Sequence, residues 1–327
     1  MIYGNEKEVG EGMITAMKKL NLKREDVLVT SKLWCDKHAP VDVRKACEMS
    51  IKNLGVDYLD LYLIHFPASF EMKDGVSIAT IDPDSVVFEY HKLEDAWGAM
   101  EELVHAGLVR SIGVSNFNKR QIERILASCT IPPAVNQVEV NIHLLNTKLI
   151  EFCYSKNILV EGYALLGSSG GQVRPVLEEE CVVEIAHKHN KTPAQVLLRH
   201  GLKRGIVVLV RSVTPERIKS NFDVFDFELT DEETEKLNNI GVNKPSSNTR
   251  NIRLTMSANY SSTAHFQAAI RGRINACLPL LSYLHRLTEH LRMLERDLRV
   301  ISLKPREREM AGRPKDDYFF YMCICLF

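Results

Sequence analysis

The residues best suited to chemistry in this sequence stand at or near the ends of short β-rich runs. They are Lys32, His65, Ser115, Asn116, Tyr163 and Arg211, and Tyr3 precedes the first helical pattern. Singly, each has an ordinary explanation, such as a strand-end lysine reaching solvent, a satisfied core histidine, turn chemistry or a surface tyrosine. Together they place a tyrosine, a lysine and a histidine on successive strand ends, which is the arrangement that an acid–base site requires.

The elements that must position these residues alternate between strand and helix patterns. The strand candidates are residues 27–34, 58–66, 111–116, 134–141, 158–165 and 206–212, several of them near-continuous apolar runs typical of strands covered on both faces. Helical spacing follows in residues 41–55 and 92–107, each ended by glycine. Helix starts are predicted at Thr192-Pro193 and Thr214-Pro215, and capping boxes at Asn5 with Glu8 and Thr230 with Glu233. This alternation predicts a parallel sheet of βα units.

Two parallel folds are compatible with this alternation, a doubly wound nucleotide-binding sheet and a βα barrel. The first usually carries G-x-G-x-x-G after its first strand, and the sequence has none. A (β/α)8 TIM-type barrel places its chemistry at the carboxyl ends of its strands, where the reactive residues here fall. The pattern therefore favours a barrel, although only six of its eight strands are recognisable.

Bulk composition excludes several classes of function. Among 327 residues, Lys plus Arg and Asp plus Glu balance at 42 each, so no net charge attracts nucleic acid or an anionic membrane. No signal peptide is visible at the N-terminus, and no apolar run reaches the roughly 20 residues of a membrane span. The eight cysteines have no metal-binding spacing, which indicates free thiols in a reducing compartment. We expect a cytoplasmic protein with no metal site and no nucleic-acid or membrane partner.

Several segments carry a resemblance to a known family. They are IYGNEKEVG, TSKLW, DLYLIHFP, GVSNFN, VNQVEVN, GYALLGS and VRSVTPERIKSNFDVFDFEL, in this order from about residue 2 to about residue 266. In these segments the chain resembles the aldo-keto reductases, a family of (β/α)8-barrel carbonyl reductases that use NADPH. The resemblance implies an oxidoreductase that reduces aldehydes or ketones to alcohols by hydride transfer from NADPH.

The resemblance also implies three catalytic residues. Tyr3 would be the general acid that protonates the carbonyl oxygen, Lys32 would stabilise the developing phenolate, and His65 would orient the carbonyl. Trp34 and Phe66 would line the substrate pocket.

The remaining matched positions would bind NADPH. Ser115, Asn116 and Gln137 would hold the nicotinamide carboxamide, and Tyr163 would stack on the ring. Leu166 and Ser168 would lie on the loop over the pyrophosphate. The adenosine end would contact Arg211, Ser212, Val213, Thr214, Arg217 and Asn221. These last residues could form only an ordinary capped helix, but a cation followed by hydroxyls and a helix N-terminus also suits a 2′-phosphate and favours NADPH over NADH.

The sequence departs from the family pattern at its start. The family pairs its lysine with an aspartate five positions before the tyrosine, and that position would precede Met1. We expect the barrel to lack its first βα unit and most of its second strand, roughly 45 residues at the usual size of a βαβ unit. Two unpaired sheet edges would follow, so we expect the chain as written to be unstable or inactive.

The expected domains are an incomplete barrel over 1–266 and a tail over 267–327 that does not resemble the family. In the tail, leucines at heptad spacing predict an amphipathic helix over 280–301, and the polar residues 306–317 predict disorder. The helix could instead pack on its own domain. Two functions stay open: a carbonyl reductase of small molecules, monomeric unless the 280–301 helix self-associates, or a catalytically impaired variant acting as a cofactor-binding or helix-mediated interaction protein.

Overall fold

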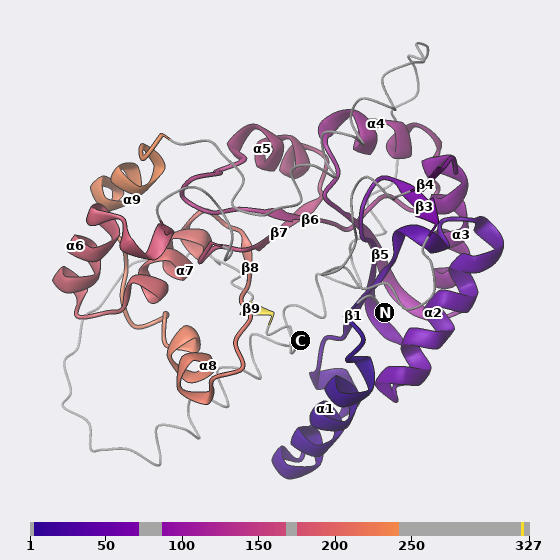
Figure 1. Cartoon of the computed structure of the whole chain (residues 1–327), viewed down its shortest axis with the longest axis horizontal. Helices are drawn as coiled ribbons and strands as arrows, with labels where there is room; N and C mark the ends of the chain where they lie inside the picture. Colours follow the sequence, from indigo (N-terminus) through magenta and orange to yellow (C-terminus); the bar gives the residue numbers. More distant parts are fainter. Residues whose placement is uncertain (1–2, 72–86, 168–174, 242–321, 324–327) are drawn as a thin grey trace, which may run out of the picture.

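A parallel sheet curled into a half-barrel organises the molecule, and the computed structural model describes residues 3–71, 87–167, 175–241 and 322–323 (Figure 1). Six parallel strands follow one another in the order β1-β2-β5-β6-β7-β8. They are β1 (Thr30–Leu33), β2 (Leu59–Ile64), β5 (Val109–Ser115), β6 (Val135–Glu139), β7 (Leu159–Tyr163) and β8 (Val207–Leu209). The predicted α/β class and six strands are confirmed.

Two further pairings were not predicted. The short strand β9 (Met322–Cys323) pairs in parallel with β8, so the edge of β8 is covered by residues from the far end of the chain. Separately, β3 (Ser69–Glu71) and β4 (Val87–Glu89) form an antiparallel pair after β2. The helix expected at 280–301 and the segment 306–317 lie outside the described residues.

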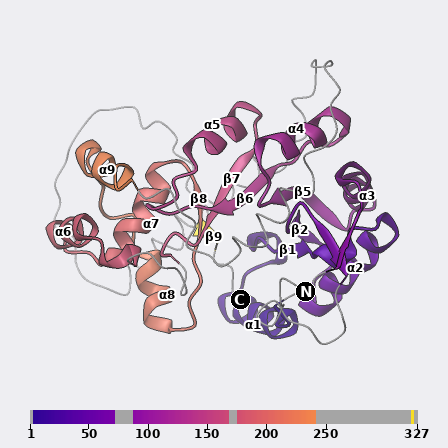
Figure 2. The same cartoon turned by 45° about the horizontal axis from the view of Figure 1, so that its top comes forward.

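Helices cover the convex face of the sheet (Figure 2). Over the described residues these are α1 (Glu6–Leu20), α2 (Pro40–Leu54), α3 (Leu93–His105), α4 (Lys119–Ser128), α5 (Thr147–Ser155), α6 (Glu180–His189), α7 (Pro193–Lys203), α8 (Pro215–Phe222) and α9 (Asp231–Asn238). The predicted glycine stop is confirmed at Gly55, which ends α2 with a left-handed φ of 65°. None of the helices in this part of the chain is long and apolar enough to cross a bilayer.

Side-chain hydrogen bonds at the first turns show which of the predicted helix starts are capped. The helix start predicted at Thr192 and the capping box predicted at Thr230 are confirmed, each threonine side chain accepting from the backbone N–H three residues on. The box predicted at Asn5 is wrong. Helix α1 still begins at Glu6, but Asn5 has φ −122° and ψ 16°, outside the extended geometry that points a capping side chain at the helix start. Thr214 precedes α8, yet its side chain makes no capping bond either.

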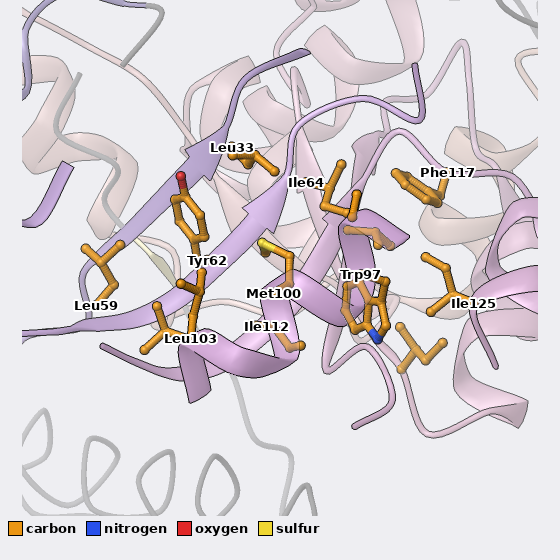
Figure 3. Packing of buried hydrophobic residues seen from close by; sticks show 14 of the residues in the cluster. Leu33, Leu59, Tyr62, Ile64, Trp97, Met100, Leu103, Ile112, Phe117 and Ile125 are labelled. Carbon is orange, nitrogen blue, oxygen red and sulfur yellow. The ribbon is translucent and has the colours of Figure 1, made fainter. Parts of the chain in front are cut away.

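The apolar core lies on both faces of the curled sheet. Figure 3 shows the outer part, where α3 packs Trp97, Met100 and Leu103 against Tyr62 and Ile64 of β2. A smaller inner cluster fills the concave side, with the buried residues Leu61, Leu63, Ala134 and Val135. Because side chains alternate along a strand, the residues two positions from these inner ones also face the concave side. This alternation brings Gln137 and Glu161 to the interior.

Helix α1 approaches α2 closely at a glycine. A Cβ on Gly10 would overlap the carbonyl group of Leu54, whereas a Cβ on Gly12 would meet nothing within 4 Å. The buried Gly10 therefore lets the two helix backbones come together. Since Tyr3 directly precedes α1, this contact helps to set where Tyr3 lies.

Candidate active site

A cavity of about 340 Å³ opens at the carboxyl ends of the strands. It gathers ten of the residues predicted from the sequence, namely Tyr3, Lys32, His65, Phe66, Ser115, Asn116, Gln137, Tyr163, Leu166 and Arg211. Carboxyl ends of parallel strands meet at one edge of a sheet, which is why residues so far apart in sequence lie together.

Aromatic rings hold the imidazole of His65 on the wall of this cavity. The Phe66 ring stacks on it with centroids 5.1 Å apart, and Trp34 meets it edge-on at 4.9 Å. Tyr3, which is 44% exposed, places its ring centroid 6.0 Å from that of His65. Trp34 does not line the cavity itself, so it acts on the site through its packing against His65.

The environment of His65 keeps its imidazole neutral. Burial, together with the positive charge of Lys32, lowers the pKa of His65 well below its usual value. Its Nδ1 is buried without a hydrogen-bond partner among the described residues. A neutral imidazole has one N–H donor and one acceptor nitrogen, so it can bind a carbonyl oxygen without bringing a charge.

A chain of hydrogen bonds links the ends of four strands around Asn116. The Tyr163 hydroxyl donates to Asn116 Oδ1 at 2.7 Å, and Asn116 Nδ2 donates to the His65 carbonyl at 2.9 Å. Ser115 Oγ donates to the backbone carbonyl of Gln137 at 2.9 Å. Asn116 has a left-handed φ of 64°, which asparagine tolerates better than most residues. The predicted nicotinamide-binding positions thus form one hydrogen-bonded group.

A buried amide–carboxylate pair lies beneath this group. Gln137 Nε2 donates to Glu161 Oε2 at 2.7 Å, and both side chains are almost inaccessible to solvent. Burial raises the pKa of Glu161, and this rise is opposed by the bond from Gln137 and by the charge of Lys32. Glu161 was not predicted as a site residue, although a glutamate inside an apolar strand pattern was a visible signal.

The residues predicted for the adenosine end lie on the segment after β8 and in α8. Of them, only Arg211 lines the cavity. The backbone N–H of Thr214 donates to Ser212 Oγ at 3.1 Å, Val213 is 80% exposed, Asn221 is buried, and Arg217 is exposed. Ser168 lies outside the described residues.

Residues without polar side chains complete the cavity and were not among the site residues predicted above. They are Ala164, Leu165, Gly167, Leu209 and Val210. Their side chains have no reactive group that would mark them in the sequence, because they contribute only backbone atoms and the shape of the cavity wall. Ala164 has an unusual positive φ of 57° where the chain turns after β7.

Among the described residues, no group of three or more His, Cys, Asp or Glu side chains could hold a metal ion. Cys35, Cys47, Cys129, Cys153 and Cys181 are free thiols.

This fold and site define an α/β half-barrel with a cavity of polar and apolar residues at its strand ends, and comparison with known proteins gives its family. Residues 1–241 match the model of the aldo/keto reductase family. The chain is 44% identical over 238 residues to aldo-keto reductase family 1 member A1-A of Danio rerio, covering 71% of this chain and 73% of that protein. It is 44% identical over 250 residues to prostaglandin-E(2) 9-reductase of Oryctolagus cuniculus, covering 74% and 77%.

A solved structure agrees with these matches. The aldose reductase of Schistosoma japonicum superposes with a TM-score of 0.70 at 44% identity, covering 77% of this chain and 81% of that one. The chain belongs to the aldo/keto reductase family and is homologous to its NADPH-dependent oxidoreductases.

Proposed function

We propose that this chain reduces an aldehyde or ketone to the alcohol with NADPH, using Tyr3 as the proton donor. The observation that carries the proposal is the single cavity that Tyr3, Lys32 and His65 share with Ser115, Asn116 and Gln137. A general acid, a cation and a neutral hydrogen-bond donor beside a group of amides and hydroxyls are the parts that such a reaction needs.

The residues present fit a nicotinamide cofactor. The Gln137 amide has its nitrogen engaged by Glu161, and the Asn116 and Ser115 groups line the cavity beside it. NADPH, when bound, would supply the hydride. The cationic Arg211 and the turn at Ser212 before α8 would hold the 2′-phosphate, which favours NADPH over NADH.

The chain's own residues would handle the carbonyl oxygen. The neutral His65 donates a hydrogen bond that orients the oxygen toward Tyr3. The Tyr3 hydroxyl then gives its proton to that oxygen as negative charge develops there. The Lys32 ammonium stabilises the phenolate left on Tyr3, and solvent restores the proton through the exposed side of the ring.

The substrate is a small carbonyl compound, and we propose that the reaction takes place in the cytoplasm. Phe66, stacked on His65, gives the cavity an apolar wall beside the reacting carbonyl. An aromatic or apolar aldehyde is therefore the first class to test.

The direct experiment follows the absorbance of reduced nicotinamide with the full chain and a panel of aromatic and aliphatic aldehydes and ketones. Two unpaired edges would predict an unstable or inactive chain, but β9 pairs with the edge of β8. We therefore expect steady oxidation of NADPH, slower oxidation of NADH, and loss of turnover in Lys32→Met. A folded wild-type chain that binds NADPH without oxidising it in the presence of any carbonyl would contradict the proposal.

A further inference from the structure

Glu161 is a carboxylate in a place where a charge needs a specific partner. It lies in the middle of β7, on the concave face of the sheet between the inward positions Leu159 and Tyr163, and is 6% exposed. Leu159 packs in the inner apolar cluster. A carboxylate buried among such residues is costly unless it is hydrogen-bonded and paired with a cation.

The first partner of Glu161 is the amide of Gln137 on the neighbouring strand. The two residues are directly opposite each other in the β6–β7 register, and Nε2 lies 2.7 Å from Oε2. Because Nε2 is the donor in this bond, Gln137 turns its NH2 group toward Glu161. The Gln137 carbonyl oxygen is then the end of the amide left to face the cavity that Gln137 lines.

The cation whose charge acts on Glu161 is the ammonium of Lys32, which enters the same interior from β1. Lys32 is 9% exposed and also lines the cavity. Three strands separate β1 from β7 in the sheet order, but the curl of the half-barrel turns their inner faces toward each other. Lys32 lines the same cavity as His65 and Gln137, and its charge acts on both Glu161 and His65.

We propose that Glu161 is a positioning residue of this active site, whose carboxylate holds the Lys32 ammonium under Tyr3 and fixes the orientation of the Gln137 amide. Its catalytic consequence rests on the function proposed above; the placement of the lysine and the amide does not. One buried carboxylate then positions both the Lys32 ammonium, which assists the proton transfer, and the Gln137 side-chain carbonyl, which would accept a hydrogen bond from the nicotinamide.

The test compares Glu161→Gln, which keeps the shape and removes the charge, with Glu161→Asp, which keeps the charge on a shorter arm. Glu139→Gln is the matched control, because Glu139 is a buried carboxylate on the same strand as Gln137 whose Oε1 accepts from Asn141 Nδ2 at 3.4 Å. Thermal melts establish that each variant is folded.

The first readout needs no turnover. A buried, paired ammonium exchanges its protons slowly, so its Nζ–Hζ signal can be observed by NMR and assigned by Lys32→Arg. We expect the Lys32 signal in the wild type and in Glu139→Gln, its loss in Glu161→Gln, and its return in Glu161→Asp. A Lys32 signal unchanged in folded Glu161→Gln would overturn the proposal.

The second readout is the reaction itself. Loss of a charged hydrogen-bond partner predicts roughly a tenfold or larger fall in kcat for Glu161→Gln, and a weaker affinity for NADPH through the freed Gln137 amide. KM for the carbonyl substrate should change little. A change in this KM alone, with kcat and NADPH affinity intact, would contradict the assigned role. If the wild type itself shows no turnover, the proposed function fails while the NMR comparison still decides the role of Glu161.

Discussion

At the scale of single residues, the protonation state of His65 determines what the site can do. Its ring lies between Phe66 and Trp34, and burial with the nearby Lys32 charge lowers its pKa well below the usual value. An ordinary histidine ionises near pH ~6.5. His65 is therefore neutral throughout the physiological range, and in the proposed reaction the proton would come from another group.

This state can be measured. We predict that the imidazole resonances of His65 do not titrate between about pH 8 and pH 5.5, because protonation would bury a charge beside Lys32. The measurement is an NMR pH titration of histidine-labelled protein, with His65→Gln identifying the signal. A His65 resonance that titrates with a midpoint near pH ~6.5 would show that the imidazole is not held neutral.

At the scale of elements, the position of Tyr3 depends on how α1 packs on α2. The contact needs Gly10, where a Cβ would overlap the Leu54 carbonyl, while Gly12 in the same helix faces open space. We predict that Gly10→Ala separates the helices, lowers the free energy of unfolding by roughly 1–3 kcal/mol and reduces turnover.

Gly12→Ala is the matched control for this change. Alanine has the higher helix propensity, so Gly12→Ala should stabilise the protein by up to about 1 kcal/mol and leave turnover unchanged. Urea unfolding and initial rates measure both effects. Equal behaviour of the two variants would mean that the close contact does not position Tyr3.

Much of the element pattern could be predicted because it is local. Thr192 and Thr230 each stand three residues before the side chain that completes a capping box, and both boxes form. Asn5 has the same spacing to Glu8, but its backbone angles prevent the bond, and no sequence rule contains those angles. The β3–β4 pair escaped prediction because it joins residues 69–71 with residues 87–89, which are not adjacent in sequence.

The site could be predicted to the extent that strand ends converge. Lys32, His65, Ser115 and Tyr163 all line the cavity, since a parallel sheet brings their strand ends to one edge. Glu161 could not be assigned in the same way. Its role depends on which face of β7 points inward and on the curl that brings β1 opposite β7, and both are properties of the assembled sheet.

At the scale of the whole molecule, buried histidines make stability depend on pH. His200 on α7 is 3% exposed, and its Nε2 lies 2.9 Å from Asn238 Oδ1. Burial, with the charges of Arg204 and Lys203, lowers its pKa to about 4. Because the folded state binds fewer protons than the unfolded state, this contribution is complete above the unfolded pKa of ~6.5 and is lost as pH falls toward the folded value.

The size of this effect follows from the shift. Between about pH 7 and pH 5, neutral His200 should account for a loss of roughly 2 kcal/mol in the free energy of unfolding. His200→Gln can still donate to Asn238 but does not ionise. We therefore predict that the variant loses less stability than the wild type over this interval in urea unfolding. Parallel pH dependences of the two proteins would exclude His200 as a cause.

If Tyr3 supplies the proton in an NADPH-dependent reduction, as we propose, its hydroxyl is essential for turnover, and Tyr3→Phe removes it. Phenylalanine keeps the ring beside His65 and removes only the hydroxyl. The matched control is Tyr154→Phe, because the Tyr154 hydroxyl bonds to the Gly205 carbonyl and does not line the cavity.

The measurement combines the rate of NADPH oxidation with the fluorescence titration of NADPH for both variants and the wild type. We predict that Tyr3→Phe loses about 10²–10⁴-fold in kcat, as expected for a general acid, while its affinity for NADPH stays within about threefold. Tyr154→Phe should turn over like the wild type. A Tyr3→Phe variant that reduces the carbonyl at the wild-type rate would show that Tyr3 is not the proton donor.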